Sequence, residues 1–282
     1  MQFYGKIVAG SDYMTVNGYL DNMQNNLYVN GVEREKIRKS INAISDRLDS
    51  YFDNSERCIH KIIEKDIFGS YSRDTMLSRN YDENSDIDYM IIFEDAKNYN
   101  PQTCLKWLRG FAECWYSTSI VKKSSPTIVI ELQNIKFELV PAYKDSYGNL
   151  YIPKDDSTWQ KTNVKDLNDK MLAINNKLFY SFKGMIRIIK YWNIKKNLRK
   201  YKSYQLETYL TEKFEFYSCK DNSLLSMLDW CFFYLSTYDY IDEYVHDRIK
   251  RAADLIGEAK YYDNIGNSEK AIECIKKILP EI

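Results

Sequence analysis

The spacing of apolar residues changes near residue 155, and this change constrains the fold of the chain more than any other feature. Before it, short apolar segments typical of β-strands predominate, whereas from about residue 160 apolar residues recur every three or four positions, as in helices. No low-complexity linker separates the two parts. We therefore predict an α+β protein in which a mixed sheet with covering helices, residues 1–155, packs against a helical domain, residues 156–282.

Within the first part, the apolar pattern predicts an order of elements. A helix over residues 33–53 should pack on the sheet through one apolar stripe. After it we expect a short strand ending at Gly69, a continuously apolar and therefore central strand over 87–93, a covering helix over 101–121 and a β-hairpin over 126–143. Gly148 and Pro153 mark loops beyond the hairpin, and a last helix begins near residue 268.

Because the charges of the chain balance, any binding site that depends on charge must come from a local cluster of residues. Forty basic and forty acidic residues cancel, so no overall field draws the chain to nucleic acid or to anionic membranes. Six scattered cysteines without a C-x-x-C pair, together with two histidines, do not form a zinc-binding pattern. Because no apolar stretch is long enough for a signal peptide or a membrane span, we expect a cytoplasmic protein with no membrane partner.

Two aspartates stand at the start of the central strand, in "DIDYMIIF". Residues two apart on a strand point to one side, so Asp86 and Asp88 place two carboxylates on one face with α-carbons about 6 to 7 Å apart. Such hard oxygen ligands suit Mg²⁺ or Mn²⁺, and two ions about 4 Å apart can hold the attacking and leaving oxygens of a phosphoryl transfer. The alternative is an ordinary solvated strand start, because a polar loop precedes it.

A turn before this strand adds a second part of the candidate site. Gly69 and Ser70 close the preceding strand, and a helix is expected to begin near Thr75. Backbone N–H groups and a hydroxyl would then gather where a triphosphate could sit. Gly-Ser by itself is common in ordinary turns, so it indicates a phosphate site only in combination with the two aspartates that follow it.

A third carboxylate should come from a strand beside the first two. In "IKFELVPAY", Glu138 shares a face with Lys136, whereas the apolar residues on either side of it point to the other face. Glu138 is therefore the candidate, and Glu131 on the other hairpin strand is the alternative. A structural interpretation also exists, in which Glu138 is a solvent-facing charge paired with Lys136.

Taken together, these motifs resemble those of the polymerase-beta-type nucleotidyltransferase superfamily. The ordered motifs are Gly69-Ser70, then Asp86 and Asp88, then Glu138 followed by "VPA". The forms "GSYSRDT", "IRIIKYWN" and "SYQLE" are similar to the branch that contains cGAS/DncV-like nucleotidyltransferases and oligoadenylate synthases. The similarity covers about residues 35–215 and implies two lobes around a central nucleotide cleft, with an N-terminal spine helix. Two departures are the fifteen residues between Ser70 and Asp86 and a Glu at the third acidic position.

The resemblance also implies roles for single residues. Asp86 and Asp88 would hold two Mg²⁺ or Mn²⁺ ions. Glu138 would complete the metal site and lower the cost of deprotonating the attacking 3′-hydroxyl. The nucleotide-binding candidates are Gly69, Ser70, Arg73, Lys190 and Ser203, which would contact phosphates, and Tyr204, which would stack on a base. Arg73 and Thr75 fit the family pattern, but they fit a structural role in the turn equally well.

A basic segment lies in the helical part of the chain. No acidic residue occurs between Asp169 and Glu207. Lys183, Arg187 and Lys190 are spaced four and three apart, so they share one helix face that could meet phosphates across the cleft. The alternatives are a solvated helix face for the basic run and a core position for Tyr204.

Three functions are consistent with these features. The first is a synthase of a cyclic oligonucleotide, most simply a cyclic dinucleotide made from purine NTPs (ATP and GTP). Family resemblance implies that its product activates a separate effector in bacterial antiphage defence (CBASS). The second function keeps the transfer but gives a linear product, or modifies RNA, a small molecule or a protein. The third is a nucleic-acid-binding sensor, although the zero net charge argues against a stable nucleic-acid partner. We also expect a monomer.

Overall fold

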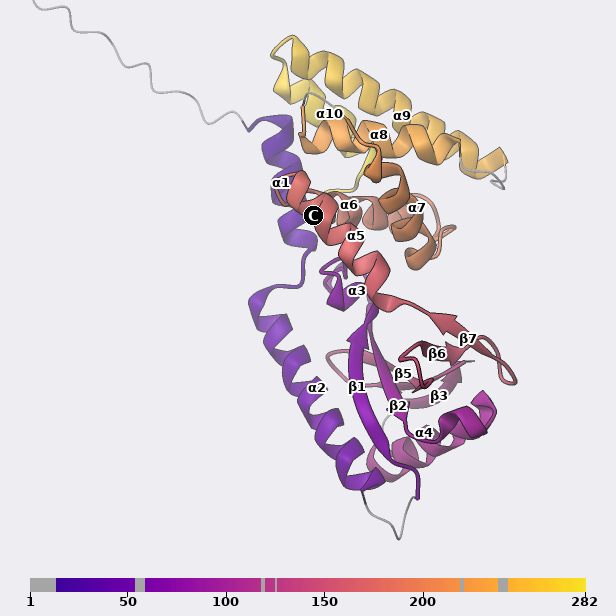
Figure 1. The fold of residues 1–282 in the computed structure, drawn as a ribbon. Helices are drawn as coiled ribbons and strands as arrows, with labels where there is room; N and C mark the ends of the chain where they lie inside the picture. Colours follow the sequence, from indigo (N-terminus) through magenta and orange to yellow (C-terminus); the bar gives the residue numbers. More distant parts are fainter. Residues whose placement is uncertain (1–13, 54–58, 118–119, 125, 219–220, 238–242) are drawn as a thin grey trace, which may run out of the picture.

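The computed structural model describes residues 14–53, 59–117, 120–124, 126–218, 221–237 and 243–282 of the 282-residue chain (Figure 1). Its helices are α1 (Val16–Leu27), α2 (Gly31–Phe52), α3 (Gly69–Ser72), α4 (Pro101–Trp115), α5 (Val164–Lys177), α6 (Phe182–Lys195), α7 (Ser203–Glu215), α8 (Leu224–Ser236), α9 (Glu243–Asn264) and α10 (Ser268–Ile278), with a 3₁₀ turn at Ala96–Asn98. Its strands are β1 (Ile62–Phe68), β2 (Asp86–Phe93), β3 (Ile120–Ser124), β4 (Thr127–Glu131), β5 (Lys136–Lys144), β6 (Leu150–Pro153) and β7 (Trp159–Thr162). Cys58 and Cys219 lie outside the described residues.

The strands form one mixed sheet with β2 inside it. The main order is β1-β2-β5-β4-β3, and β6 and β7 continue from β5. β2 and β5 are parallel, whereas the other pairs are antiparallel. The predicted central strand is confirmed, because β2 has a neighbour on each side and is buried from Tyr89 to Phe93. The predicted hairpin is confirmed as the antiparallel pair β4–β5.

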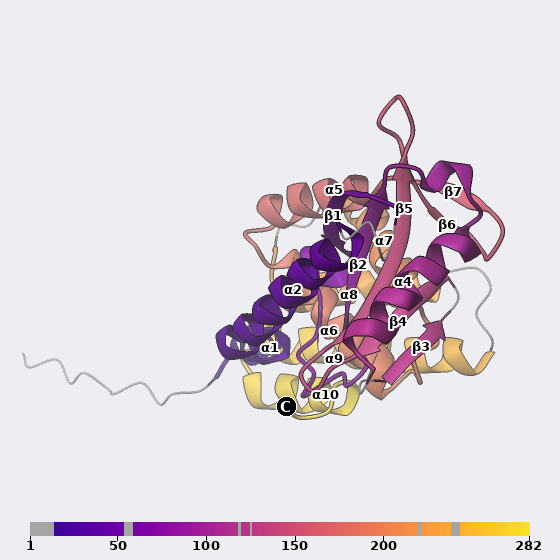
Figure 2. The same cartoon turned by 90° about the horizontal axis from the view of Figure 1, so that it is seen from below.

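Two helices cover one face of this sheet, as the apolar stripes predicted. Asn30 caps α2 by accepting from the N–H of Glu33, and Asn100 caps α4 in the same way at Thr103. Their apolar faces join one buried cluster with the strand residues of β2, β4 and β5 that point to this side. Figure 2 shows α2 and α4 lying over the sheet. We call the sheet with these two helices the sheet lobe.

The remaining long helices form a second cluster, which we call the helical lobe (α1 and α5–α10; Figure 1). α6 lies at its centre, and nearly every residue from Phe182 to Asn193 is buried. α1 packs tightly on α6, because a Cβ atom at Gly184 would lie 1.3 Å from Oε1 of Gln24. Among the helices described, none is both long and apolar enough to cross a membrane.

Several sequence-based expectations for the elements were wrong. No strand was expected beyond the hairpin, where Gly148 and Pro153 marked loops and helical spacing began near residue 160, but segments 150–153 and 159–162 are the paired strands β6 and β7. The helix expected over 101–121 ends at Trp115, and its last predicted residues belong partly to β3. β7 lies beyond the predicted boundary at residue 155, and α1 packs with the helical lobe although it precedes the sheet. The division at residue 155 therefore stays a prediction.

Candidate active site

The turn after β1 is held against the metal-ligand candidates on β2. Gly69 has φ +74°, a left-handed value that favours glycine, and a Cβ atom there would lie 1.8 Å from Oδ2 of Asp88. The carbonyl of Ser70 accepts from the N–H groups of Thr75 and Met76, both at 3.0 Å. The chain therefore folds back directly after the single turn α3. The prediction of a helix that begins near Thr75 was wrong, because residues 73–85 form an irregular loop.

The acidic candidates share one face of the sheet. Across the parallel pair β2–β5, Asp86 lies opposite Lys136 and Asp88 lies opposite Glu138. The alternate residues of both strands, such as Ile87 and Phe137, point to the other face and are fully buried. The alternation of strand residues thus predicted correctly that Glu138 and Lys136 lie on the side of the aspartates.

Burial and the neighbouring carboxylates raise the pKa values of two of these acids. Burial, and then the charges of Asp86 and Glu138, raise the pKa of Asp88 from 3.8 to about 7. The pKa of Glu138 is also raised, first by burial and then by Asp86. Lys136 opposes this rise in the pKa of Glu138 but does not cancel it. The structure therefore brings Asp86, Asp88 and Glu138 together as one acidic cluster.

The donor atoms of this acidic cluster fit a hard divalent cation. All are carboxylate oxygens, and their mutual repulsion favours a positive charge among them. In this structure Lys136 supplies that charge, since its Nζ lies 3.0 Å from Oδ2 of Asp86 and 3.1 Å from Oε1 of Glu138. Over the described ranges, no three Asp, Glu, His or Cys side chains already form a group that could hold a metal ion. The metal-binding roles of the acids stay a prediction.

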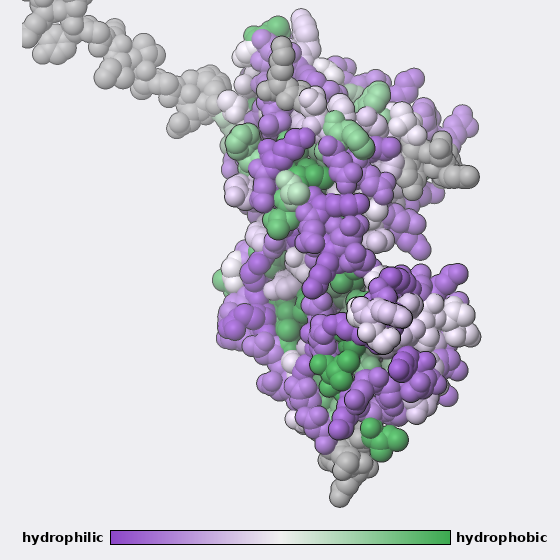
Figure 3. Space-filling view, viewed as in Figure 1, coloured by the Kyte–Doolittle hydropathy of each residue, from purple (hydrophilic) through white to green (hydrophobic). Residues whose placement is uncertain are grey.

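A cavity of about 620 Å³ lies beside the acidic cluster, with walls from both lobes. Its volume falls in the range of ~300–1,000 Å³ that is usual for small-molecule sites. In the space-filling view most of the surface is hydrophilic, and the outline narrows where the two lobes meet (Figure 3). Of the predicted residues, Gly69, Ser70, Arg73, Asp86, Asp88, Lys190, Ser203 and Tyr204 line the cavity. Glu138 does not, although it lies opposite Asp88.

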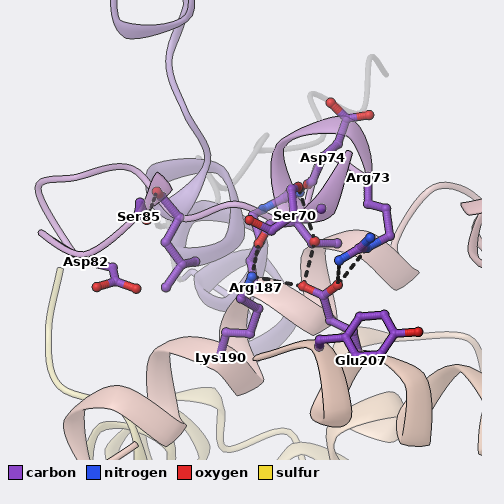
Figure 4. A network of polar contacts seen from close by, with 12 residues as sticks. Ser70, Arg73, Asp74, Asp82, Ser85, Arg187, Lys190 and Glu207 are labelled. Carbon is purple, nitrogen blue, oxygen red and sulfur yellow. Dashed lines mark hydrogen bonds and ion pairs between the residues drawn. The ribbon is translucent and has the colours of Figure 1, made fainter. Parts of the chain in front are cut away.

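A buried ion cluster joins the turn to the helical lobe at this cavity. The carboxylate of Glu207 on α7 is 0% exposed, and it accepts from Arg73 at 2.7 Å and from Lys190 at 2.9 Å (Figure 4). The hydroxyl of Thr75 donates to it at 2.8 Å. Although burial alone would raise it, the pKa of Glu207 is lowered by Lys190 and Arg73. One carboxylate thus fixes two of the predicted phosphate-binding cations.

The other two cations predicted on the face of Lys190 do not reach the cavity. Nη1 of Arg187 donates to the carbonyl of Asp74 at 2.7 Å, and Nε donates to the carbonyl of Gln24. Lys183 forms an ion pair with the side chain of Asp74 at 3.2 Å. Lys183 and Arg187 therefore hold the loop after α3 against α1 and α6. The prediction that these two side chains meet phosphates was wrong, because both contact Asp74 and neither lines the cavity.

Two parts of the cavity wall were not predicted from the sequence. Arg199, between α6 and α7, forms a two-pronged ion pair with Asp82 of the irregular loop, at 2.7 and 3.3 Å. The second part is the segment 160–164, where β7 leads into α5. Neither part carries a motif. Glu207 did leave a signal, since it is the first acidic residue after a long basic segment.

Ser203 and Tyr204 begin α7 at the outer part of the cavity wall. Both residues are exposed, Tyr204 to 63%. The alternative that Tyr204 is a core residue was therefore wrong. An exposed aromatic ring beside a cavity can stack on a planar ligand.

Comparison with protein families identifies the class. Residues 14–175 match the Second Messenger Oligonucleotide or Dinucleotide Synthetase domain, which is more than half of the chain. The chain therefore belongs to this family. The predicted resemblance to cGAS/DncV-like nucleotidyltransferases is confirmed, and the predicted enzyme class is the one that the family defines.

A curated relative has a description that fits this family. A "Probable cyclic nucleotide synthase IK1_05630" from Bacillus cereus (strain VD146) is 27% identical over 183 residues, which make up 56% of this chain and 54% of the relative. The match thus spans about half the length of that curated relative.

Solved structures share the fold over nearly the whole chain. The cyclic AMP-GMP synthase DncV of Vibrio cholerae, in complex with the linear intermediate pppA(3′,5′)pG, superposes with a TM-score of 0.74 at 11% identity, over 95% of this chain and 96% of that one. CdnC of E. coli MS115-1, in a complex with HORMA-deltaN, gives 0.71 at 14% identity, over 95% and 98%. At these identities the similarity shows the fold alone, and it confirms the predicted α+β nucleotidyltransferase fold.

Proposed function

We propose that this chain joins two purine nucleoside triphosphates and closes them into a cyclic dinucleotide, releasing one pyrophosphate for each bond formed. The observation that carries the proposal is the acidic cluster packed against the Gly69-Ser70 turn, beside a cavity with fixed cations and an exposed tyrosine. Membership of a second-messenger synthetase family supports the product class. The complex of the V. cholerae relative with pppA(3′,5′)pG supports purine bases and a two-nucleotide product.

In this proposal the turn and the buried cations bind the triphosphate of the donor nucleotide. Ser70 offers a hydroxyl and its backbone N–H at the cavity wall. Arg73 and Lys190 add two positive charges against the single negative charge of Glu207, so this ion cluster keeps a net positive charge. Because Glu207 holds both cations in place, they need little reorganisation when the phosphates arrive.

The transfer requires a 3′-hydroxyl in line with the α-phosphorus of the donor. The hydroxyl oxygen forms a bond to phosphorus, the bond from phosphorus to the pyrophosphate oxygen breaks, and the hydroxyl proton passes to Glu138. The raised pKa of Glu138 makes its carboxylate a stronger base than an ordinary glutamate. Divalent ions held by Asp86 and Asp88, when bound, would neutralise charge on the attacking and leaving oxygens.

The same residues serve ring closure in this proposal. The linear intermediate turns its own triphosphate toward the turn and presents its free 3′-hydroxyl to the acidic cluster. Tyr204 supports a base by stacking, which gives affinity with little base selectivity. We include in the proposal a role in bacterial antiphage signalling, in which the diffusible product activates a separate effector. The family description as a second-messenger synthetase supports that role.

The nucleic-acid sensor is less well supported by the basic segment. Lys183 and Arg187 contact Asp74 and do not line the cavity, and Arg187 is buried. A phosphate backbone that bound to these side chains would first have to break those contacts. Salt-sensitive binding of duplex DNA or RNA would speak for the sensor nonetheless.

The proposal is tested by the product that purified protein makes from an equal mixture of the four NTPs with Mg²⁺. We expect mass spectrometry to find a phosphatase-resistant cyclic dinucleotide that contains purines. A phosphatase-sensitive product would instead indicate a linear oligonucleotide or a modified acceptor. The double variant Asp86→Asn with Asp88→Asn should form no product, whereas Glu94→Gln, an exposed change just after β2, should remain active. Equal activity of the double variant and the wild type would contradict the proposal.

A further inference from the structure

Lys136 lies inside the acidic cluster rather than beside it. Its Nζ contacts Oδ2 of Asp86 on the neighbouring strand and Oε1 of Glu138 on its own strand, at 3.0 and 3.1 Å. The lysine is placed there by strand geometry, since Lys136 pairs in register with Asp86 and lies two residues before Glu138. Its side chain is 22% exposed, so water only partly screens the contacts.

Among the described residues, Lys136 is the one cation that forms an ion pair with the acidic cluster. Arg73, the other cation close to Asp88, is bound to Glu207 instead. The two oxygens that Lys136 occupies belong to two of the residues proposed as metal ligands. An ammonium group and a divalent ion cannot lie against the same carboxylate oxygens, because like charges at such distances repel strongly.

We propose that Lys136 is a built-in counter-ion that occupies the metal position when no nucleotide is bound and must move away before divalent ions bind. This inference rests on the proposed function, since it concerns the same carboxylates. Lys136 would lower the affinity of the nucleotide-free cluster for divalent ions and keep the carboxylates close together. Metal binding would then be favoured when an NTP supplies additional oxygen ligands.

The chemistry of lysine suits such an exchange. Its ammonium is a compact, strongly hydrated charge on a flexible stem of four carbons, so it can leave the carboxylates and enter water. An arginine at this position would bind a carboxylate with two parallel hydrogen bonds and would be harder to displace. The two substitutions Lys136→Gln and Lys136→Arg therefore have opposite expected effects on metal affinity.

The test measures Mn²⁺ binding to the nucleotide-free full-length chain by electron paramagnetic resonance of free Mn²⁺. Loss of two partly exposed ion pairs should raise the Mn²⁺ affinity of Lys136→Gln about fivefold over the wild type. Lys136→Arg should bind Mn²⁺ more weakly than the wild type. Lys97→Gln removes an exposed lysine from the 3₁₀ turn before α4, outside the cavity lining, and its affinity should stay unchanged.

Melting temperatures give a second readout, which separates this role from a merely structural one. In EDTA, Lys136→Gln should melt below the wild type, and added Mn²⁺ should raise its melting temperature by more than that of the wild type. If Lys136→Gln does not fold, the expected loss of Mn²⁺ affinity in Lys136→Arg still tests the inference.

The outcomes distinguish this inference from the proposed function. Equal Mn²⁺ affinity of the wild type, Lys136→Gln and Lys136→Arg, with binding lost in Asp86→Asn, would overturn the role of Lys136 and leave the proposed function intact. Unchanged Mn²⁺ binding in the double variant Asp86→Asn with Asp88→Asn would overturn both. Absence of Mn²⁺ binding in the nucleotide-free wild type and in Lys136→Gln alike would overturn the role of Lys136 alone, because the proposed function requires metal only together with an NTP.

Discussion

The site requires glycine at position 69, where the turn comes very close to Asp88. Gly69 directly follows β1, and its left-handed backbone lets the phosphate turn come within contact of a carboxylate on β2. Any side chain at this position would push Asp88 out of the acidic cluster. The sequence indicated a turn at Gly69, but only the coordinates show that the glycine is needed for this close approach.

We expect Gly69→Ala to destabilise the protein more than Gly148→Ala. Both glycines have similar left-handed angles, φ +74° and +79°, so both variants should lose about 1–2 kcal/mol from backbone strain. A Cβ atom at Gly148 would meet nothing within 4 Å, whereas one at Gly69 would collide with Asp88. The collision should lower the unfolding free energy of Gly69→Ala by a further ~1–3 kcal/mol, as measured by denaturation in urea. Equal losses in the two variants would show that Asp88 does not crowd the turn.

The raised pKa of Asp88 makes the stability of the metal-free protein depend on pH. Between 3.8 and about 7, the folded state holds a proton on Asp88 that the unfolded state has released. The unfolding free energy contributed by this group therefore falls as pH rises through that window, and it is lowest above it. Asp88→Asn should lack this decline and should melt above the wild type at pH 8 in EDTA.

Melting curves between pH 4 and 8 in EDTA check this prediction. The difference in melting temperature, Asp88→Asn minus wild type, should grow as pH rises. Asp46→Asn, an exposed change on α2, should keep the pH dependence of the wild type. The same pH dependence in Asp88→Asn and the wild type would mean that Asp88 is not held in a repulsive, buried position.

At the scale of elements, α6 and α7 act through the ion cluster around Glu207. α6 brings Lys190, α7 brings Glu207, and the loop after α3 brings Arg73 and Thr75, so three segments far apart in the sequence meet at one carboxylate. All four residues are buried. Such a cluster is costly to break, because a lost partner leaves buried charges unpaired.

We expect Glu207→Ala to lower the unfolding free energy by about 3–5 kcal/mol, because Arg73 and Lys190 would remain buried without a counter-charge. Glu212→Ala is the matched control, since Glu212 lies on the same helix but is exposed. It should change stability by less than about 0.5 kcal/mol. Denaturation in urea measures both. A small effect of Glu207→Ala would mean that the two cations find other partners or move into the cavity.

The elements that sequence patterns predicted are those with long or strongly apolar runs. The stripe of α2 and the apolar run of β2 each extend over several residues, so their period is clear. β6 and β7 have only four residues each, and "WQKT" has no apolar alternation, so their pairing was not visible in the sequence. α6 was misread because the lysines and arginine among its apolar residues face protein partners instead of solvent.

At the scale of the whole molecule, the large apolar clusters of the two lobes are joined by polar contacts near the cavity and by a smaller apolar cluster that includes Phe68 and Val164. The sheet lobe presents the acidic cluster and the turn, and the helical lobe presents Lys190, Ser203 and Tyr204. Glu207 and the Asp82–Arg199 pair connect the two sides. Motif spacing predicted which residues would meet, because the motifs lie at strand and helix ends. It did not predict which counter-charges hold them, because those pairings depend on the placement of whole lobes.

The central claim is that the acids of β2 and β5 and the turn at Gly69 form one metal-dependent nucleotide site. It is tested most directly by anomalous diffraction from crystals grown with Mn²⁺ and an ATP analogue that cannot be cleaved between its α- and β-phosphates. The account predicts Mn²⁺ peaks bound by Asp86 and Asp88, with the triphosphate on the turn at Ser70. Triphosphate or Mn²⁺ bound elsewhere, with these two carboxylates free of metal, would contradict it.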